Sequence, residues 1–308
     1  RELDDLILVR SDGTPVYNFC AVVDDATMGI THIIRGEDHL TNTPKQIQLY
    51  QALGYEPPVF AHIPLILGLD RTRLSKRHGA TSALAYRDMG YLADAVVNYL
   101  ARLAWSHGDQ EIFTRAELIE KFSIDNVGTS AGVYNPEKAE WVNAQYLKAM
   151  PADLLAQQVK PIILASGQVI PGDDAWLQRM VATLQERAKT LVELVELAKF
   201  YLCDQIAIEP AAAAKFLKST AADPLRSLRT ALAAAQPWQH DPIKAAFESV
   251  MQAHGLNLGK LAQPVRVAVT GGTVSPGIFE VLEVLGKERT LARLDRAIAL
   301  AAQATPSS

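Results

Sequence analysis

The pattern that most constrains this chain is a strand, a helix and a second strand over residues 30–67. The stretch "ITHIIRG" (30–36) is short, rich in β-branched residues and ends at a glycine, which favours a strand. "VFAHIPLIL" (59–67) predicts a second, buried strand. Between them, "TNTPKQIQLYQALGYEPP" predicts a helix with Thr43 as N-cap, Pro44 in its first turn and Gly54 as its stop. This order resembles part of a doubly wound sheet, in which ligands bind beyond the carboxyl ends of the strands.

The flanking segments indicate an α/β part followed by an all-α part. "DLILVRSDGTPVYNF" gives two apolar runs around Asp12-Gly13, which predicts a β-hairpin. Residues 91–105 have apolar positions at helical spacing, and Thr114 with Glu117 has the spacing of a capping box. Asn135 and Pro136 open another helix, and nearly everything from residue 142 onward reads as helical. The Ala-rich segment 211–235 is predicted as helix because it carries an apolar stripe: Leu217, Leu225, Leu228 and Leu232.

Composition excludes several classes of protein. The net charge of −4 over 308 residues argues against a strongly basic nucleic-acid binder. The two cysteines, Cys20 and Cys203, lie too far apart for a zinc ribbon or a disulfide framework, which favours a reducing, cytoplasmic setting. No apolar run approaches the roughly 20 residues that cross a bilayer. The chain starts at Arg1 directly before a strand-like run, so we expect a fragment of a longer protein.

The stretch "GLDRTRLSKRHGATS" (68–82) holds four cations, Arg71, Arg73, Lys76 and Arg77, with no acid between them. Such a loop is often only a solvated surface, and a localisation-type cluster is another reading. Because it follows a candidate strand and contains Ser75 and Gly79, it is also suited to bring a lysine and backbone N–H groups to a phosphate. By chemistry alone these alternatives stay open.

A resemblance adds to this reading. "RLSKRHGATS" resembles the second signature of class I aminoacyl-tRNA synthetases, in the form found in bacterial glutamyl-tRNA synthetases. Further stretches resemble the same family in its order, and the likeness covers almost the whole chain: "DGTPVYNFCAVVDD", "ITHIIRGEDHLTNTPKQIQLYQALG", "LARLAWSHGDQEIFTRAELIEKF" and "LAQPVRVAVTGG" followed by "SPGIFEVLEVLGKERTLARL".

The resemblance implies an ATP site on the basic loop. Lys76 matches the signature's second lysine, which contacts the ATP phosphates and stabilises the transition state of adenylate formation. Arg73 stands at the position of the signature's first lysine, so a planar guanidinium with several donors replaces a compact ammonium there. Ser75 and His78 belong to the extended motif and are secondary candidates for the same site. ATP would arrive with Mg²⁺, and no structural metal is implied.

The resemblance also implies a glutamate site. Tyr17 and Arg35 match positions that hold the amino acid, and an arginine is the natural bidentate partner of a carboxylate. From the residues alone, Tyr17 reads as a hairpin core residue and Arg35 as an ion pair with Glu37 or Asp38. A third contact, an asparagine in some relatives, is not carried over because this chain has Ala21.

Other polar residues favour structural roles. Asp24 and Asp25 are read as adjacent acids on a strand, which would point to opposite faces and not share a site. The histidines have no spacing typical of a metal site and are read as packed or surface residues: His32, His39 and His62. Trp105 and Trp141 are read as core.

The C-terminal helices resemble the family's anticodon-binding cage. There Arg266 stands where an anticodon base is contacted, whereas the bare sequence reads it as an ordinary surface arginine. The resemblance thus implies three domains: 1–70, the end of a Rossmann-like catalytic domain; 71–141, a helical stem-contact domain; and 142–308, an α-helical anticodon-binding domain.

The implied activity is glutamate–tRNA ligation, with glutamate, ATP and tRNA-Glu as substrates, by a monomer that contacts no membrane. The family's first ATP signature, a His-rich helix start, does not occur in these residues, so we expect the chain to be inactive alone. The alternatives are a tRNA-binding module without catalysis, and an enzyme with relaxed specificity that also charges tRNA-Gln. A paralogue that glutamylates a modified anticodon base lacks an anticodon domain, so residues 142–308 argue against it.

Overall fold

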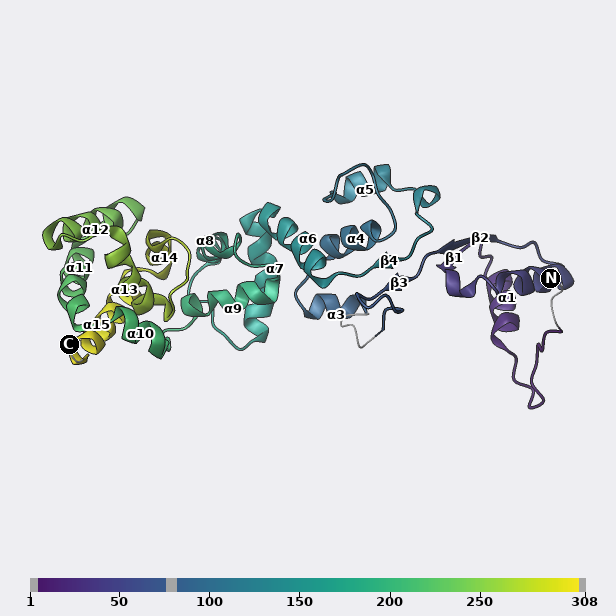
Figure 1. Cartoon of the computed structure of the whole chain (residues 1–308), viewed down its shortest axis with the longest axis horizontal. Coiled ribbons are helices and arrows are strands. Elements are labelled where there is room, and N and C mark those ends of the chain that lie inside the picture. Colours follow the sequence, from purple (N-terminus) through teal and green to yellow (C-terminus); the bar gives the residue numbers. More distant parts are fainter. Residues whose placement is uncertain (1–4, 76–81, 305–308) are drawn as a thin grey trace. The chain divides into compact units, whose positions relative to one another are not determined.

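The computed structural model describes residues 5–75 and 82–304, which divide into two compact units. The first unit comprises the described residues of Arg1–Tyr86 and Ala93–Val142, and the second those of Arg87–Leu92 and Asn143–Ser308. Figure 1 shows both units, with labels on many of their helices and strands. No helix within the described ranges is long and apolar enough to cross a membrane.

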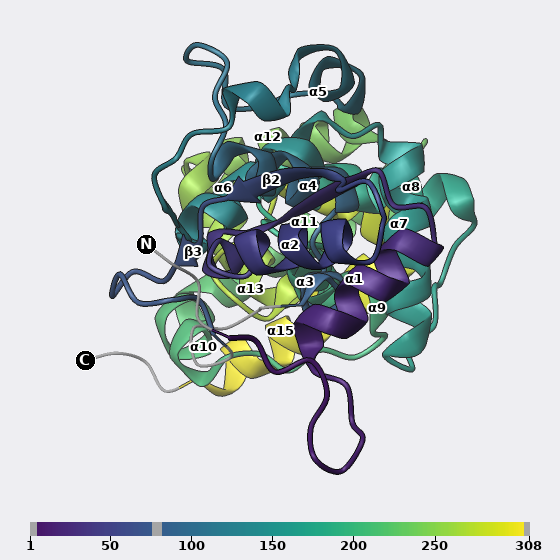
Figure 2. The same cartoon turned by 90° about the vertical axis from the view of Figure 1, so that its right-hand side faces the viewer.

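The predicted strand, helix and strand form at the start of the first unit. β1 (His32–Gly36) and β2 (Val59–Ile63) pair in parallel, with His32 opposite Val59, and α2 (Thr43–Ala52) connects them. A parallel pair needs such a crossover because a tight turn joins only antiparallel strands. α1 (Tyr17–Thr27) lies beside α2, and both lie against the strand pair (Figure 2). Their shared core is made of Val22, Leu49 and Tyr50, with Phe60 of β2 packed against it.

Several local predictions in this unit were wrong. The turn at Asp12-Gly13 forms, with Val9 bridged to Pro15, but the second apolar run starts helix α1 and not a strand. Val22 and Ala26 are spaced four apart and face the core, so helical packing prevails over the hairpin. Asp24 and Asp25 therefore lie on a helix, not on a strand.

The second correction concerns Thr43, which is the first residue of α2, while Asn42 occupies the N-cap position. The Thr43 hydroxyl bonds to side chains of the strand pair and does not cap its own helix. In addition, the single strand predicted over 59–67 is divided at Pro64, because proline lacks the N–H that a strand interior needs. The second part, β3 (Ile66–Leu67), pairs in parallel with β4 (Gly132–Val133).

The remainder of the first unit is helical and is held by local caps. Its helices are α4 (Ala93–Arg102), α5 (Arg115–Lys121) and the 3-10 turn η3 (Ile124–Asn126), while α3 (Ala83–Asp88) and α6 (Pro136–Ala149) run into the second unit. Asn135 accepts from the Lys138 N–H at the start of α6, as predicted. Trp105 is buried as expected, whereas Trp141 is partly exposed beneath the Lys138 ammonium.

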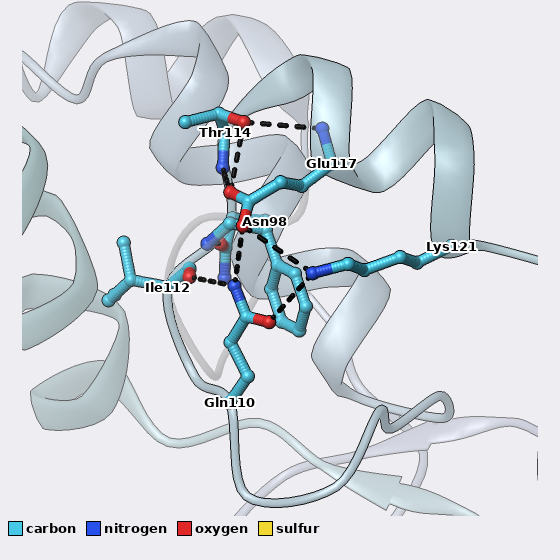
Figure 3. Close-up of polar contacts among 7 residues, drawn as sticks. Asn98, Gln110, Ile112, Thr114, Glu117 and Lys121 are labelled. Atoms are coloured by element: carbon cyan, nitrogen blue, oxygen red, sulfur yellow. Dashed lines mark hydrogen bonds and ion pairs between the residues drawn. The ribbon is translucent and has the colours of Figure 1, made fainter.

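The predicted capping box at Thr114 and Glu117 is present (Figure 3). The Thr114 N–H donates to the Glu117 carboxylate at 2.7 Å, and the Gln110 amide donates to it at 3.1 Å. These donors lower the pKa of Glu117 to about 2, the Thr114 backbone N–H contributing most. Buried Asn98 of α4 accepts from the Phe113 N–H and donates to the Glu111 carbonyl, which fixes the loop that leads into α5.

The second unit is built of helices, as the sequence predicted. They are α7 (Ala152–Ala165), α8 (Asp174–Leu184), α9 (Leu191–Leu202), α10 (Pro210–Phe216), η4 (Ser219–Ala221), α11 (Ala222–Ala234), α12 (His240–His254), α13 (Leu258–Thr270), α14 (Ile278–Leu285) and α15 (Lys287–Gln303). The Ala-rich segment is two helices separated by η4, and its leucine stripe is fully buried.

Arginines of α15 hold the segment that joins α9 to α10. Arg289, Arg293 and Arg296 donate to the carbonyls of Tyr201, Cys203 and Ile206, respectively. Arg293 is 5% exposed and also donates to the carbonyl of Val269 on α13. Burial lowers its pKa to about 10. One side chain therefore satisfies backbone groups of two elements and fixes the end of the helix that carries Arg266.

Candidate active site and RNA-contact surface

Arg35 lies near the carboxyl end of β1, directly opposite His62 of β2 in the parallel register. Residues opposite each other in register point to the same face, so both side chains point toward the start of α2. There the Arg35 Nη2 donates to the Thr43 hydroxyl at 2.7 Å, and its Nε lies 3.5 Å from the His62 Nε2. The guanidinium also lies 5.4 Å from the centre of the Phe60 ring, a cation–π distance.

This arrangement determines which form of His62 is present. An arginine N–H only donates, so the Arg35 Nε, 3.5 Å from the His62 Nε2, requires an acceptor at that nitrogen, and the Thr43 hydroxyl lies 2.9 Å from the same nitrogen. Nε2 must then carry a lone pair, and the imidazole proton sits on Nδ1. Burial lowers the pKa of His62, and the charges of Arg35 and His39 lower it further. A neutral His62 is therefore part of the support that holds Arg35.

Tyr17 stands beside this support at the start of α1. It is 54% exposed, so it is not a core residue, and its hydroxyl lies 3.4 Å from the Nδ1 of His39. The Nδ1 of His39, on the 3-10 turn η1 (Glu37–His39), also lies 3.2 Å from the side-chain amide nitrogen of Asn42, and the His39 carbonyl oxygen lies 3.4 Å from the Thr43 hydroxyl oxygen. The structure thus brings Tyr17 and Arg35 together through His39 and Thr43.

The carboxylates next to Arg35 have other partners. Glu37 accepts from the backbone N–H of Leu65, and Asp38 lies 2.9 Å from the Arg73 guanidinium. Gly36 allows the Asp38 side chain to approach, since a Cβ at this position would lie 2.5 Å from its carboxylate oxygen. These contacts leave the Arg35 guanidinium with the neutral partners Thr43 and His62.

The basic loop begins with a tight turn after β3. Asp70 accepts from the N–H and hydroxyl of Thr72, Arg71 has φ 58°, and Arg73 returns beside Leu67 in an antiparallel bridge. The Arg73–Asp38 pair therefore ties the loop to η1. Ser75 is exposed at the end of the described part. Lys76 and His78, the other two predicted ATP contacts, lie outside the described residues.

Arg266 occupies a half-buried position on α13 in the second unit. Its Nε is buried and has no hydrogen-bond partner within 5–75 and 82–304. Burial lowers the pKa of Arg266, and the neighbouring Arg187 lowers it further. Arg187 lines a cavity of about 480 Å³ together with Thr183, Pro276 and Glu280. A half-buried guanidinium with an unused donor, in the field of the Arg187 charge, favours an acceptor-rich ligand.

The sequence reading missed four contributors to these sites. His39 and His62 were assigned to packing or the surface, and Thr43 to a cap, because a single sequence does not show the register that places them around Arg35. Arg187 was not singled out, since its proximity to Arg266 depends on helix packing. Among the residues that the structure describes, no group of three or more His, Cys, Asp or Glu is placed to hold a metal ion.

A parallel βαβ unit with Arg35 and His62 at the strand ends, followed by helices, is an α/β architecture of the class in which ligands bind beyond the carboxyl ends of the strands. Residues 1–141 match the family model "tRNA synthetases class I (E and Q), catalytic domain", and residues 154–298 match "Anticodon binding domain". The chain belongs to the class I tRNA synthetases of this E and Q type.

Relatives within the family point to one branch. The chain is 56% identical over 297 residues to the glutamate–tRNA ligase of Syntrophobacter fumaroxidans, and 54% identical over 300 residues to that of Thermodesulfovibrio yellowstonii. Each alignment covers 96% of this chain and 63% or 64% of the relative, respectively, so the chain spans just under two thirds of their length. A crystal structure of a glutamate tRNA ligase from Elizabethkingia meningosepticum in complex with its amino acid matches with TM-score 0.83 and 30% identity, over 96% of this chain and 62% of that one.

Proposed function

We propose that this chain serves in glutamate–tRNA ligation, in which ATP activates glutamate as an adenylate and tRNA-Glu then accepts the glutamyl group. The observation that carries the proposal is the Arg35 guanidinium, partly buried and held by the neutral partners Thr43 and His62 at the ends of two parallel strands. A guanidinium held in this orientation suits a carboxylate ligand. Among the described residues, no carboxylate forms a hydrogen bond or an ion pair with it. Tyr17, 3.4 Å from His39, would close the other side of the glutamate site.

ATP would bind where the basic loop follows β3. Lys76 would meet the phosphates and stabilise the charge that develops during adenylate formation, with Ser75 and His78 beside it. Arg73 is already directed to η1 by Asp38, so it would act from the edge of the site. Mg²⁺ would enter with the ATP phosphates, because this cation retains water and phosphate ligands and does not require a protein cage.

Transfer would depend on tRNA bound along the helical part. We propose that 71–141 contacts the tRNA stem and 142–308 the anticodon, with 1–70 ending the catalytic domain. Arg266, with Arg187 beside it, would read an unpaired base by hydrogen bonding or stacking. The protein would act in the cytoplasm as a monomer; both cysteines are free thiols, which suits a reducing compartment.

The proposal is tested by glutamate-dependent ATP–pyrophosphate exchange in the whole protein, with tRNA-Glu present. Arg35→Lys keeps the charge but loses the fork, and Arg35→Ala loses both. We expect the KM for glutamate to rise in the order wild type, Lys, Ala, with the KM for ATP unchanged. Arg115→Lys, at an exposed pair with Asp94 away from the strand ends, is the matched control. An unchanged KM for glutamate in Arg35→Ala would remove Arg35 from the site.

A further inference from the structure

A second cavity in the helical unit has the properties of an anion-binding site. It has a volume of about 450 Å³ and lies among α10, η4, α11 and α13, all within the second unit. Three lysines from different segments line it: Lys215 at the end of α10, Lys218 in the following turn and Lys260 in the first turn of α13. We call it the lysine pocket.

The charge of the lysine pocket is not balanced locally. No carboxylate lines it, and none of the three ammonium groups forms an ion pair with another residue of the described part. Asp223, at the start of α11, is paired with Arg226. The three lysines are exposed, so water screens their mutual repulsion, and an anion placed among them would be attracted to all three.

The backbone adds donors at the same place. α13 has thirteen residues, and its Asn257 cap accepts the Lys260 N–H. Leu258 and Gly259 precede that bonded amide, and their N–H groups have no acceptor among the described residues. Gly259 lines the pocket, and a Cβ there would meet only the Asn257 side chain, at 3.6 Å, so the backbone is open to a ligand. A helix start with free N–H groups and a glycine adds a favourable field to the three lysines.

Much of the pocket wall is apolar, beside the polar side chains of Thr220, Asn257 and Gln263. The apolar side chains include Phe216, Leu225, Leu256, Leu261 and Pro264, and the Lys215 ammonium lies 5.2 Å from the centre of the Phe216 ring. Simple anions would gain nothing from these walls, whereas a flat ring would be desolvated against them. A cavity of this volume also exceeds what an isolated phosphate needs.

We propose that the lysine pocket binds a nucleotide unit, with its phosphate at the three lysines and the start of α13 and its base against the apolar walls. The ligand would be a free nucleotide or an unpaired nucleotide of an RNA, since both present the same chemistry. The lysine pocket shares no lining residue with the cavity beside Arg187. The proposal that it binds a nucleotide does not rest on the proposed ligase activity.

The test is a titration of the chain with AMP, adenosine and a short single-stranded RNA, followed by amide NMR shifts of Gly259 and Lys260. We expect AMP to bind saturably and adenosine at least about tenfold more weakly, because it lacks the phosphate. Replacing Lys215, Lys218 and Lys260 together by Ala should lower the affinity for AMP roughly tenfold, because each exposed contact contributes a few-fold.

The matched control replaces Lys160, Lys199 and Lys244 by Ala, which removes the same charge from exposed, ion-paired positions of the same unit. It should leave AMP affinity within about twofold. An RNA that competes with AMP and binds more tightly identifies a polynucleotide as the source, and AMP binding without competition identifies a free nucleotide. Equal affinity for AMP and adenosine, equal loss in both triple variants, or no saturable binding would overturn the proposal.

Discussion

Thr43→Val is the substitution that best separates the support of Arg35 from Arg35 itself. It keeps the branched shape but removes the hydroxyl that accepts from Arg35 at 2.7 Å and meets the His62 Nε2 at 2.9 Å. The guanidinium keeps its charge and its place over Phe60, so only its orientation is released. The expected defect is therefore specific to the ligand that the fork must meet.

The magnitude follows from the bond that is lost. A hydrogen bond to a charged group contributes about 1.5–3 kcal/mol. Because Arg35 is only partly buried, water would replace part of this interaction, and we expect the lower value. About 1.4 kcal/mol corresponds to a factor of ten, so the KM for glutamate should rise roughly tenfold with little change in kcat.

The assay is ATP–pyrophosphate exchange at varied glutamate concentration in the whole protein. Thr43→Ser restores the hydroxyl and should restore the KM. Imidazole nitrogen NMR gives an independent readout, since His62 in the wild type should show its proton on Nδ1. A KM for glutamate that is unchanged in Thr43→Val, or equally raised in Thr43→Ser, would refute the supporting role.

The same cluster predicts a pH dependence of stability. The pKa of His62 is lowered in the folded chain, so the unfolded chain takes up this proton first as the pH falls. The free energy of unfolding should therefore decrease as the pH drops from about 6.5 through the folded pKa. In His62→Gln this component of the pH dependence should disappear from thermal unfolding curves. If wild type and variant showed the same slope between pH 7 and 5, the inference would fail.

Four further substitutions test other parts of the account. Asn98→Ala removes the side-chain partner of the buried Phe113 N–H and of the part-buried Glu111 carbonyl and should lower the free energy of denaturant unfolding by about 2–4 kcal/mol; a loss below about 1 kcal/mol would contradict this. Glu117→Gln should abolish the part of the stability that the wild type loses as the pH falls from 4.5 toward 2, since the folded pKa is about 2; an unchanged acid limb in thermal melts would argue against the cap. Lys76→Ala should slow adenylate formation on the order of 10²-fold with similar KM values for glutamate and tRNA, so unchanged single-turnover rates would exclude it as the transition-state group. Arg266→Ala should lower kcat/KM for tRNA roughly tenfold and spare ATP, and unchanged tRNA kinetics would exclude its anticodon role.

Local chemistry made part of the fold predictable. The β1–α2–β2 unit, the Thr114–Glu117 capping box and the leucine stripe of residues 217–232 depend on residues close in sequence, and all three are present. The helix start at Tyr17 was missed because a turn signal at Asp12-Gly13 fits both a hairpin and a strand-to-helix turn. Burial of Val22 against Leu49 settles that choice, and this contact is not visible in the sequence.

The candidate sites likewise contain residues that the sequence identifies and residues that only the structure identifies. Arg35 could be singled out by its resemblance to a family motif, but the neutral state of His62 depends on register with β1. Likewise, Lys218 and Lys260 lie more than forty positions apart, and only the packing of α10 and α11 against α13 makes them one pocket. Side chains that act together across elements therefore required the structure.

The most direct test of the central claim is aminoacylation of purified tRNA-Glu and tRNA-Gln by the whole protein with ATP and labelled glutamate. The account predicts ATP-dependent glutamylation of tRNA-Glu that is lost in Arg35→Ala and retained in Arg115→Lys. Charging of tRNA-Gln with glutamate as well would show relaxed specificity within the same chemistry. Absence of glutamylated tRNA-Glu, or equal charging in Arg35→Ala, would contradict the claim that Arg35 holds glutamate for its ligation to tRNA.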